Sequence, residues 1–106
     1  MKSYPVSEES RAKMYEYGIP EYMHGSLIRY FEEHIPPGHF LTAVLENDFM
    51  GVFMHADERN ILALKGYSMW MYNEAPGRYS GSWGSKEAVA KWLAMEEVEG
   101  NEITIA

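Results

Sequence analysis

The sequence predicts an all-α protein, a compact bundle of about five helices, and three observations support this fold class. Apolar residues recur at the three- and four-residue spacing of a helix face along most of the chain. No segment shows the sustained alternation of apolar and polar residues that marks a half-buried strand. Cap and stop residues separate the periodic segments at helix-length intervals. With 106 residues, 46% of them hydrophobic, residues 1–106 are expected to form a single domain.

The first two helices are delimited by a serine, a glycine and prolines. Ser7 precedes two glutamates and the segment closes at Gly18, which is the expected order of an N-cap, an acidic first turn and a C-terminal glycine. Pro20 can occupy the first position of a second helix. That helix should end near Ile35, because the residue before Pro36 is disfavoured in the α region.

A third helix is expected from about Pro37 to Asn47, followed by a corner. Asn47 tolerates the left-handed conformation that often ends a helix. Asp48 can then cap a short continuation through Phe53. The apolar stripe of the third helix comprises Phe40, Leu41, Val44 and Leu45.

The segment from Glu58 to about Glu74 is expected to form one central, buried helix. Asp57 can cap its N-terminus, and Ala75-Pro76 stops it. Apolar side chains nearly surround its axis, as they do in a helix of the interior.

The last helix is expected to follow a cap at Ser85. Its apolar stripe contains Val89, Trp92 and Leu93 and turns polar at Glu96. We therefore expect the helix to end there, with residues 97–106 forming an acidic tail that is frayed or pairs as a short strand.

Composition excludes several classes of function. The chain has 16 acidic and 9 basic residues, a formal charge of −7, which disfavours general nucleic-acid binding and favours a basic partner surface. It has no cysteine, so disulfides, thiolate zinc sites and cysteine nucleophiles are excluded. There is no apolar run of signal-peptide or membrane-helix length, which leads us to expect a cytoplasmic protein without membrane contact.

The search for a catalytic or metal-binding pattern is negative. The four histidines show neither an HExxH motif nor the i,i+4 pairing of a helical zinc site, so neither a metal nor another cofactor is expected. The serines lack a GxSxG elbow, and no Walker-type loop is present. We therefore expect no enzymatic activity. His39 remains a candidate binding residue, because the first turn of a helix carries free backbone donors, although a structural role is the alternative.

The loop from Gly77 to Ser85 is the best candidate binding site in the sequence. Arg78 can pair with a phosphate or carboxylate, while Tyr79 or Trp83 stacks on a base or packs against a partner. The loop directly precedes a helix N-terminus, which can hold an anion. The alternative interpretation is that Trp83 closes one end of the bundle and the glycines only permit the turn.

Two features of composition bear on partners. The eight methionines are best explained as core-filling side chains, and the alternative is an exposed methionine-rich groove for partner helices. Tyr67, Trp70 and Tyr72 place three bulky rings in a short segment. A monomer of this size is not expected to cover all three, so the sequence also predicts a helical homodimer.

A family resemblance rests on several short motifs. They are Ile-Pro-Glu-Tyr at residues 19–22, Ile-Pro-Pro-Gly-x-Phe-Leu-x-Ala-Val-Leu-x-Asn-Asp at residues 35–48, Ala56-Asp57, Tyr72-Asn73 and Trp83-Gly84-Ser85. Through them the chain resembles a family of small phage and prophage proteins without an established function, from about residue 19 to residue 93. It departs from the family pattern in the loop between Pro76 and Trp83 and in the acidic tail after Met95. The resemblance implies an accessory protein that acts inside a bacterium, and it supplies no catalytic residues.

Three functional hypotheses follow. The first is a non-enzymatic phage-type protein that binds a host bacterial protein or complex and modulates or inhibits it, for example to block a host defence. The second is a sponge that sequesters a nucleotide-like signal through Arg78 and aromatic stacking. The third, less favoured because the negative charges are scattered, is an acidic mimic of DNA.

Overall fold

A computed structural model describes residues 5–76 and 81–105, with side chains described as far as Met95, and all regular structure in these ranges is helical. This confirms the predicted all-α class. The helices are α1 (Glu8–Glu16), α2 (Glu21–Glu33), α3 (His39–Leu45), α4 (Phe49–His55), α5 (Glu58–Leu62), α6 (Leu64–Asn73) and α7 (Lys86–Ile105). Their number exceeds five because the expected continuation after Asp48 is the separate helix α4, and the expected fourth helix is divided into α5 and α6.

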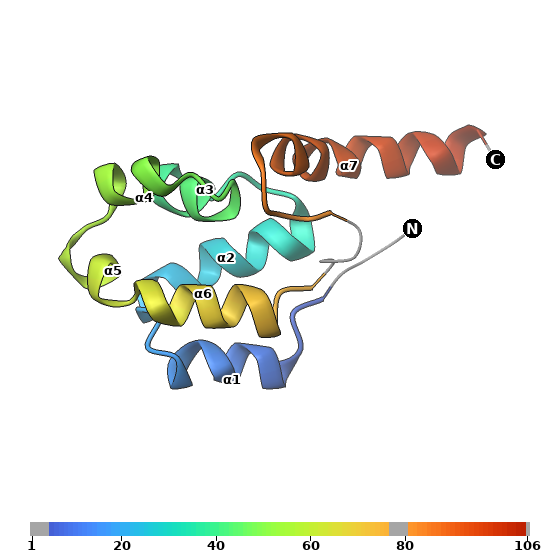
Figure 1. Cartoon of the computed structure of the whole chain (residues 1–106). Helices are drawn as coiled ribbons and strands as arrows, with labels where there is room; N and C mark the ends of the chain where they lie inside the picture. The colour runs from blue at the N-terminus through green and yellow to red at the C-terminus, as the bar shows by residue number, and fades with distance from the viewer. Residues whose placement is uncertain (1–4, 77–80, 106) are drawn as a thin grey trace.

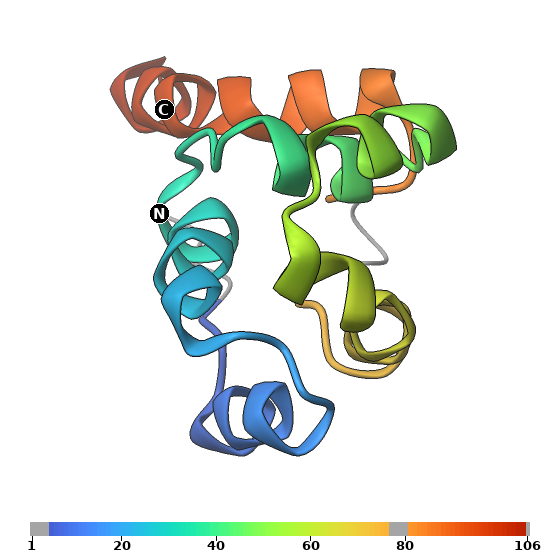
Figure 2. The same cartoon turned by 90° about the vertical axis from the view of Figure 1, so that its left-hand side faces the viewer.

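The helices enclose one core. In Figure 1, α2 and α6 lie in the middle, α1 lies below them, and α3, α4 and α7 lie above. Figure 2, turned by 90°, shows α2 and α6 on opposite sides of the interior, with α7 crossing over the top. Helices α3 and α4 pack closely against each other, and α4 and α5 lie at the end of the molecule opposite to the C-terminus of α7.

Four helices begin at the expected caps, whereas α2 begins at Glu21, after the expected Pro20, and α3 begins at His39, after the expected Pro37. Each of four predicted N-caps accepts a hydrogen bond from the backbone amide three residues on: Ser7 from Ser10, Asp48 from Gly51, Asp57 from Asn60 and Ser85 from Ala88, at 2.8–3.1 Å. Asn47 is left-handed (φ 60°), as expected, and so is His34 (φ 59°) at the end of α2. Short polar side chains therefore set where most of these helices begin.

Two tryptophans organise the core. Trp70 of α6 is fully buried, and its Nε1 donates to the carbonyl of Ser10 at 2.8 Å, which ties α6 to α1. Trp92 of α7 is also buried, and its Nε1 donates to the carbonyl of Tyr30 in α2 at 2.8 Å. Each indole buries a large apolar area while its polar atom stays hydrogen-bonded.

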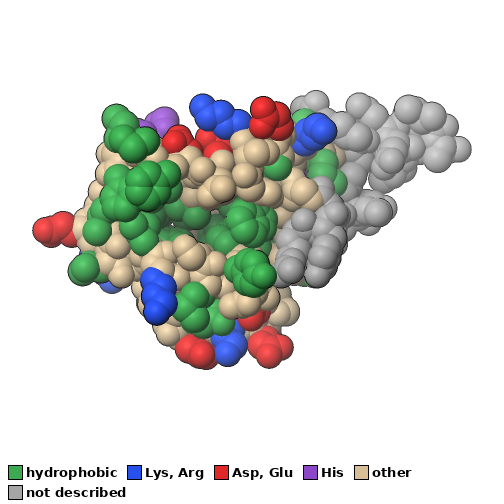
Figure 3. Space-filling view, in the orientation of Figure 1, with side chains coloured by type: hydrophobic (Ala, Val, Ile, Leu, Met, Phe, Trp, Pro, Cys, Tyr) green, Lys and Arg blue, Asp and Glu red, His purple; other side chains and the backbone are tan. Residues whose placement is uncertain are grey.

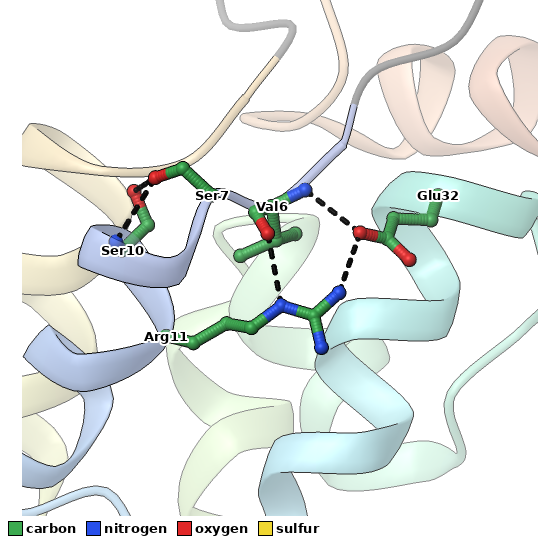
Figure 4. Close-up of polar contacts among 5 residues, drawn as sticks. All are labelled: Val6, Ser7, Ser10, Arg11 and Glu32. Carbon is green, nitrogen blue, oxygen red and sulfur yellow. Dashed lines mark hydrogen bonds and ion pairs between the residues drawn. The ribbon is translucent and has the colours of Figure 1, made fainter.

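A polar cluster fastens the segment before α1 to α2 (Figure 4). One oxygen of the Glu32 carboxylate accepts both the Val6 amide at 2.9 Å and the Arg11 guanidinium at 2.8 Å. Arg11 also donates from Nε to the Val6 carbonyl at 2.9 Å. Because backbone groups take part, this cluster fixes the chain more firmly than a lone surface ion pair would.

The prediction of one buried helix from Glu58 to Glu74 was wrong. The chain leaves helical geometry at Ala63 (φ −97°, ψ 6°), between α5 and α6. Tyr67 and Trp70 are buried, whereas Leu62 is 87% exposed and Tyr72 is 68% exposed. The segment is therefore only partly buried, although apolar residues surround its axis.

The expected end of the last helix near Glu96 was also wrong, because α7 continues to Ile105. No proline follows Glu96, and Gly100 inside a helix costs only about 1 kcal/mol relative to alanine. The loss of the apolar stripe marks the point where α7 leaves the core rather than where the helix stops, and its last turns project beyond the bundle (Figure 1).

Candidate functional site

The described part of the 77–85 loop is hydrogen-bonded to the helical core. Arg78 and Tyr79 lie outside the described residues. The buried Tyr30 hydroxyl donates to the Ser82 carbonyl, and the Gly84 amide donates to the Leu45 carbonyl, both at 2.7 Å. Trp83 is half-buried and packs against the core. For Trp83 the alternative interpretation, a plug at the end of the bundle, fits better than an exposed stacking residue.

The indole nitrogen of Trp83 gives a prediction about stability. Its Nε1 is buried and has no hydrogen-bond partner among the described residues. An unpaired buried donor costs about 1–3 kcal/mol. Trp83→Phe removes the donor and keeps an aromatic ring, so we expect its unfolding free energy to equal or exceed the wild-type value in urea denaturation. A loss above about 2 kcal/mol would show that the donor is satisfied in solution or that the larger ring is needed.

His39 lies beside a second histidine. Its ring centroid lies 5.2 Å from that of His55, with the planes 25° apart, and both side chains are exposed. The two rings meet because His39 is the first residue of α3 and His55 is the last residue of α4, and these two helix ends lie side by side. Among the described residues, no group of three or more histidine, aspartate or glutamate side chains is placed to hold a metal ion.

A more prominent feature is an exposed apolar surface on α4 and α5, which we call the α4–α5 face. Among the described residues eleven large apolar side chains are exposed, and six of them fall between residues 49 and 62, which concentrates them on two short helices. These six, which define the face, are Phe49, Met50, Phe53, Met54, Ile61 and Leu62. The hydrophobic side chains gather over α4 and around the hollow beside it in Figure 3.

Helix geometry explains why α4 exposes these groups. Phe49 and Phe53 are four residues apart, as are Met50 and Met54, so the four side chains occupy one outward arc. The inward arc holds Gly51, whose absent side chain lets α4 approach Ala43 of α3. No residue of α4 is fully buried. The largest apolar side chains of α4 therefore contribute little to the core.

Two shallow hollows adjoin the face. The first, of about 240 Å³, lies between α4 and α6. The second, of about 360 Å³, lies at the α4–α5 corner. Their linings are mostly apolar, and the carboxylates at their margins are Asp48, Asp57 and Glu58. A third hollow, of about 280 Å³, lies beside the start of α7 and includes Lys91.

One carboxylate next to the face, that of Asp57, is held by local hydrogen bonds. Asp57 accepts a hydrogen bond from the Tyr22 hydroxyl, which lowers the pKa of Asp57, and the Asn60 amide lowers it further. Arg59 lies over the Tyr22 ring, with Cζ 5.0 Å from the centroid. Asp57 therefore keeps its negative charge at neutral pH.

Sequence reasoning missed the α4–α5 face as a site, although a signal was present. The repeat Phe-Met-x-x-Phe-Met at residues 49–54 places two large apolar pairs at a spacing of four in a helix too short to surround itself with core. The hypothesis of an exposed methionine-rich groove pointed in this direction, since Met50 and Met54 are exposed. The preferred explanation, core packing, holds for Met14 and Met71.

Comparisons with protein-family models, with curated proteins and with solved structures found no match. In the part of the chain that the structure describes, no helix combines the length and the apolar character needed to cross a membrane.

Proposed function

We propose that this protein is a non-enzymatic accessory protein of phage or prophage type, which binds a host bacterial protein through the α4–α5 face and modulates or inhibits it. One observation carries the proposal: α4 presents two phenylalanines and two methionines to solvent and buries none of its residues fully. Large contiguous apolar patches on folded domains mark interaction sites, and aromatic and methionine side chains are enriched at interfaces. The family resemblance favours the bacterial cytoplasm as the place of action.

The character of the hollows favours a protein partner over a nucleotide at this face. Sites for small ligands usually enclose about 300–1,000 Å³. The hollow between α4 and α6 measures about 240 Å³, below this range, and the hollow at the α4–α5 corner measures about 360 Å³, near its lower end. The described residues that line the two hollows beside the face include three carboxylates and neither lysine nor arginine. A phosphate group would be repelled there, while one apolar side chain of a partner fits the smaller hollow.

A capture experiment with a matched control tests the proposal. Phe49→Ser/Met54→Ser changes two side chains that are 70% and 76% exposed, so its melting temperature should stay close to that of the wild type. Tyr15→Ser, at a 59% exposed apolar position on α1, is the control. We expect wild type and the control to recover the same protein from bacterial lysate and the double variant to lose it.

The result that would contradict the proposal is equal recovery by all three proteins, which would place binding elsewhere. Mass spectrometry of small molecules in the same eluates checks the alternative function. A retained nucleotide, unaffected by the double substitution, would favour the sponge.

A further inference from the structure

The charges around the α4–α5 face restrict the chemistry of what covers it. Asp48 lies beside the first hollow, and Asp57 and Glu58 lie beside the second. Asp48 uses one oxygen to cap α4, yet a carboxylate has about four acceptor positions, so it can still pair with a cation. From residue 39 to residue 76 the chain has five acidic and two basic residues. Arg59, one of these two, lies over the Tyr22 ring.

A second copy of the chain is a poor occupant. A symmetric dimer through the face would bring Asp48, Asp57 and Glu58 near their own copies, and each chain carries a formal charge of −7. Like charges that face each other across an interface oppose association. The same charges attract a partner whose apolar side chains are flanked by lysine or arginine.

The shape of the face indicates the conformation of the partner. Strand addition requires a free strand edge, and all regular secondary structure among the described residues is helical. Docking of a helix requires an apolar groove with side-chain pockets. Phe49 and Phe53 of α4 line the first hollow, and Ile61 and Leu62 of α5 line the second. Methionine side chains adapt to the surface of such helices.

We propose that the α4–α5 face binds a basic amphipathic helix of the partner protein, an inference that rests on the function proposed above. One large apolar side chain of that helix enters the hollow between Phe53 and Tyr67. Its lysine or arginine side chains pair with Asp48 and Glu58 at the margins. The charge pairs speed association and select the partner, while the apolar anchor supplies most of the affinity.

Defined peptides test this inference without knowledge of the natural partner. The probe is a fluorescein-labelled amphipathic peptide of about 18 residues, or five helical turns, built from leucine, lysine and one tryptophan. Its first control replaces every lysine by glutamate, and its second contains two central prolines that prevent the helix. By fluorescence anisotropy, we expect the basic peptide to bind at least about tenfold more tightly than either control. Its affinity should fall as salt is raised.

Variants of the protein locate the binding. Phe49→Ser/Met54→Ser should weaken the basic peptide at least about tenfold, and Tyr15→Ser should leave its affinity unchanged. Glu58→Lys reverses a charge in the first turn of α5 and should weaken binding severalfold. Its matched control, Glu9→Lys, makes the same change in the first turn of α1 and should have no effect.

The inference and the proposed function fail in different ways. The inference of a basic helical partner is overturned if the basic and acidic peptides bind equally well. It is also overturned if wild type and Phe49→Ser/Met54→Ser bind the basic peptide equally well. If capture of a host protein still depends on the face, the proposed function survives that result. Sedimentation equilibrium that shows a dimer lost on the same double substitution identifies a second copy as the occupant and overturns the inference.

Discussion

Gly66→Ala is expected to destabilise the protein by about 3 kcal/mol or more, although replacing glycine by alanine within a helix ordinarily adds about 0.5–1 kcal/mol of stability. Gly66 is buried in α6, where the helix passes the end of α1. A Cβ atom at this position would overlap the carbonyl oxygen of Tyr17 and lie 3.0 Å from its carbonyl carbon. These are backbone atoms, so relief requires α1 and α6 to separate, which disturbs the hydrogen bond from the Trp70 indole to the Ser10 carbonyl.

The control is Gly25→Ala, for which we expect a change in stability of the opposite sign. Gly25 is exposed within α2, and its added Cβ would meet only the guanidinium end of Arg29, at 3.1 Å, which can move aside. We expect Gly25→Ala to match or exceed wild-type stability by up to about 1 kcal/mol. Urea unfolding followed by circular dichroism measures both variants. Equal and small effects of the two substitutions would mean that α1 does not pack on α6 in solution as described.

The sequence was most informative about boundaries set by local chemistry. Ser7, Asp48, Asp57 and Ser85 were recognised as N-caps because a short polar side chain satisfies a free amide of the first turn, and this interaction depends on few other residues. The corner at Asn47 was recognised for a similar reason, since asparagine tolerates the left-handed conformation. Local signals therefore located α1 and α4 and the starts of α5 and α7.

What the sequence could not reveal depends on which apolar side chains find partners. The helical conformation breaks at Ala63, between α5 and α6. Across this break, the buried Asn60 side chain accepts a hydrogen bond from the Tyr67 hydroxyl at 2.6 Å. Periodicity detects an apolar face but not whether another helix covers it. The exposure of Phe49 and Leu62 therefore became visible only in three dimensions. Of the candidate residues, Trp83 proved half-buried, and His39 proved to stack on His55.

Trp92→Ala is expected to cost about 3–5 kcal/mol, a large share of the roughly 5–15 kcal/mol that stabilises a typical domain. The indole is 1% exposed, donates to the Tyr30 carbonyl and lies 4.4 Å, centroid to centroid, from the His34 ring. The His34 ring also bonds to the Trp92 carbonyl at 2.7 Å. Truncation leaves a cavity between α2 and α7, so the unfolding midpoint should fall steeply and amide protection in α7 should be lost first.

Trp92→Phe separates the two contributions of this side chain. It keeps most of the ring but removes the hydrogen bond to the Tyr30 carbonyl, so we expect a smaller loss, of about 1–2 kcal/mol. Because Trp92 and the α4–α5 face lie on different helices, Trp92→Phe should bind the basic peptide as wild type does wherever the domain remains folded. If Trp92→Ala lowered the free energy of unfolding by less than about 1 kcal/mol, α7 would contribute little to the core. The stability of the bundle would then come from α1, α2, α3 and α6.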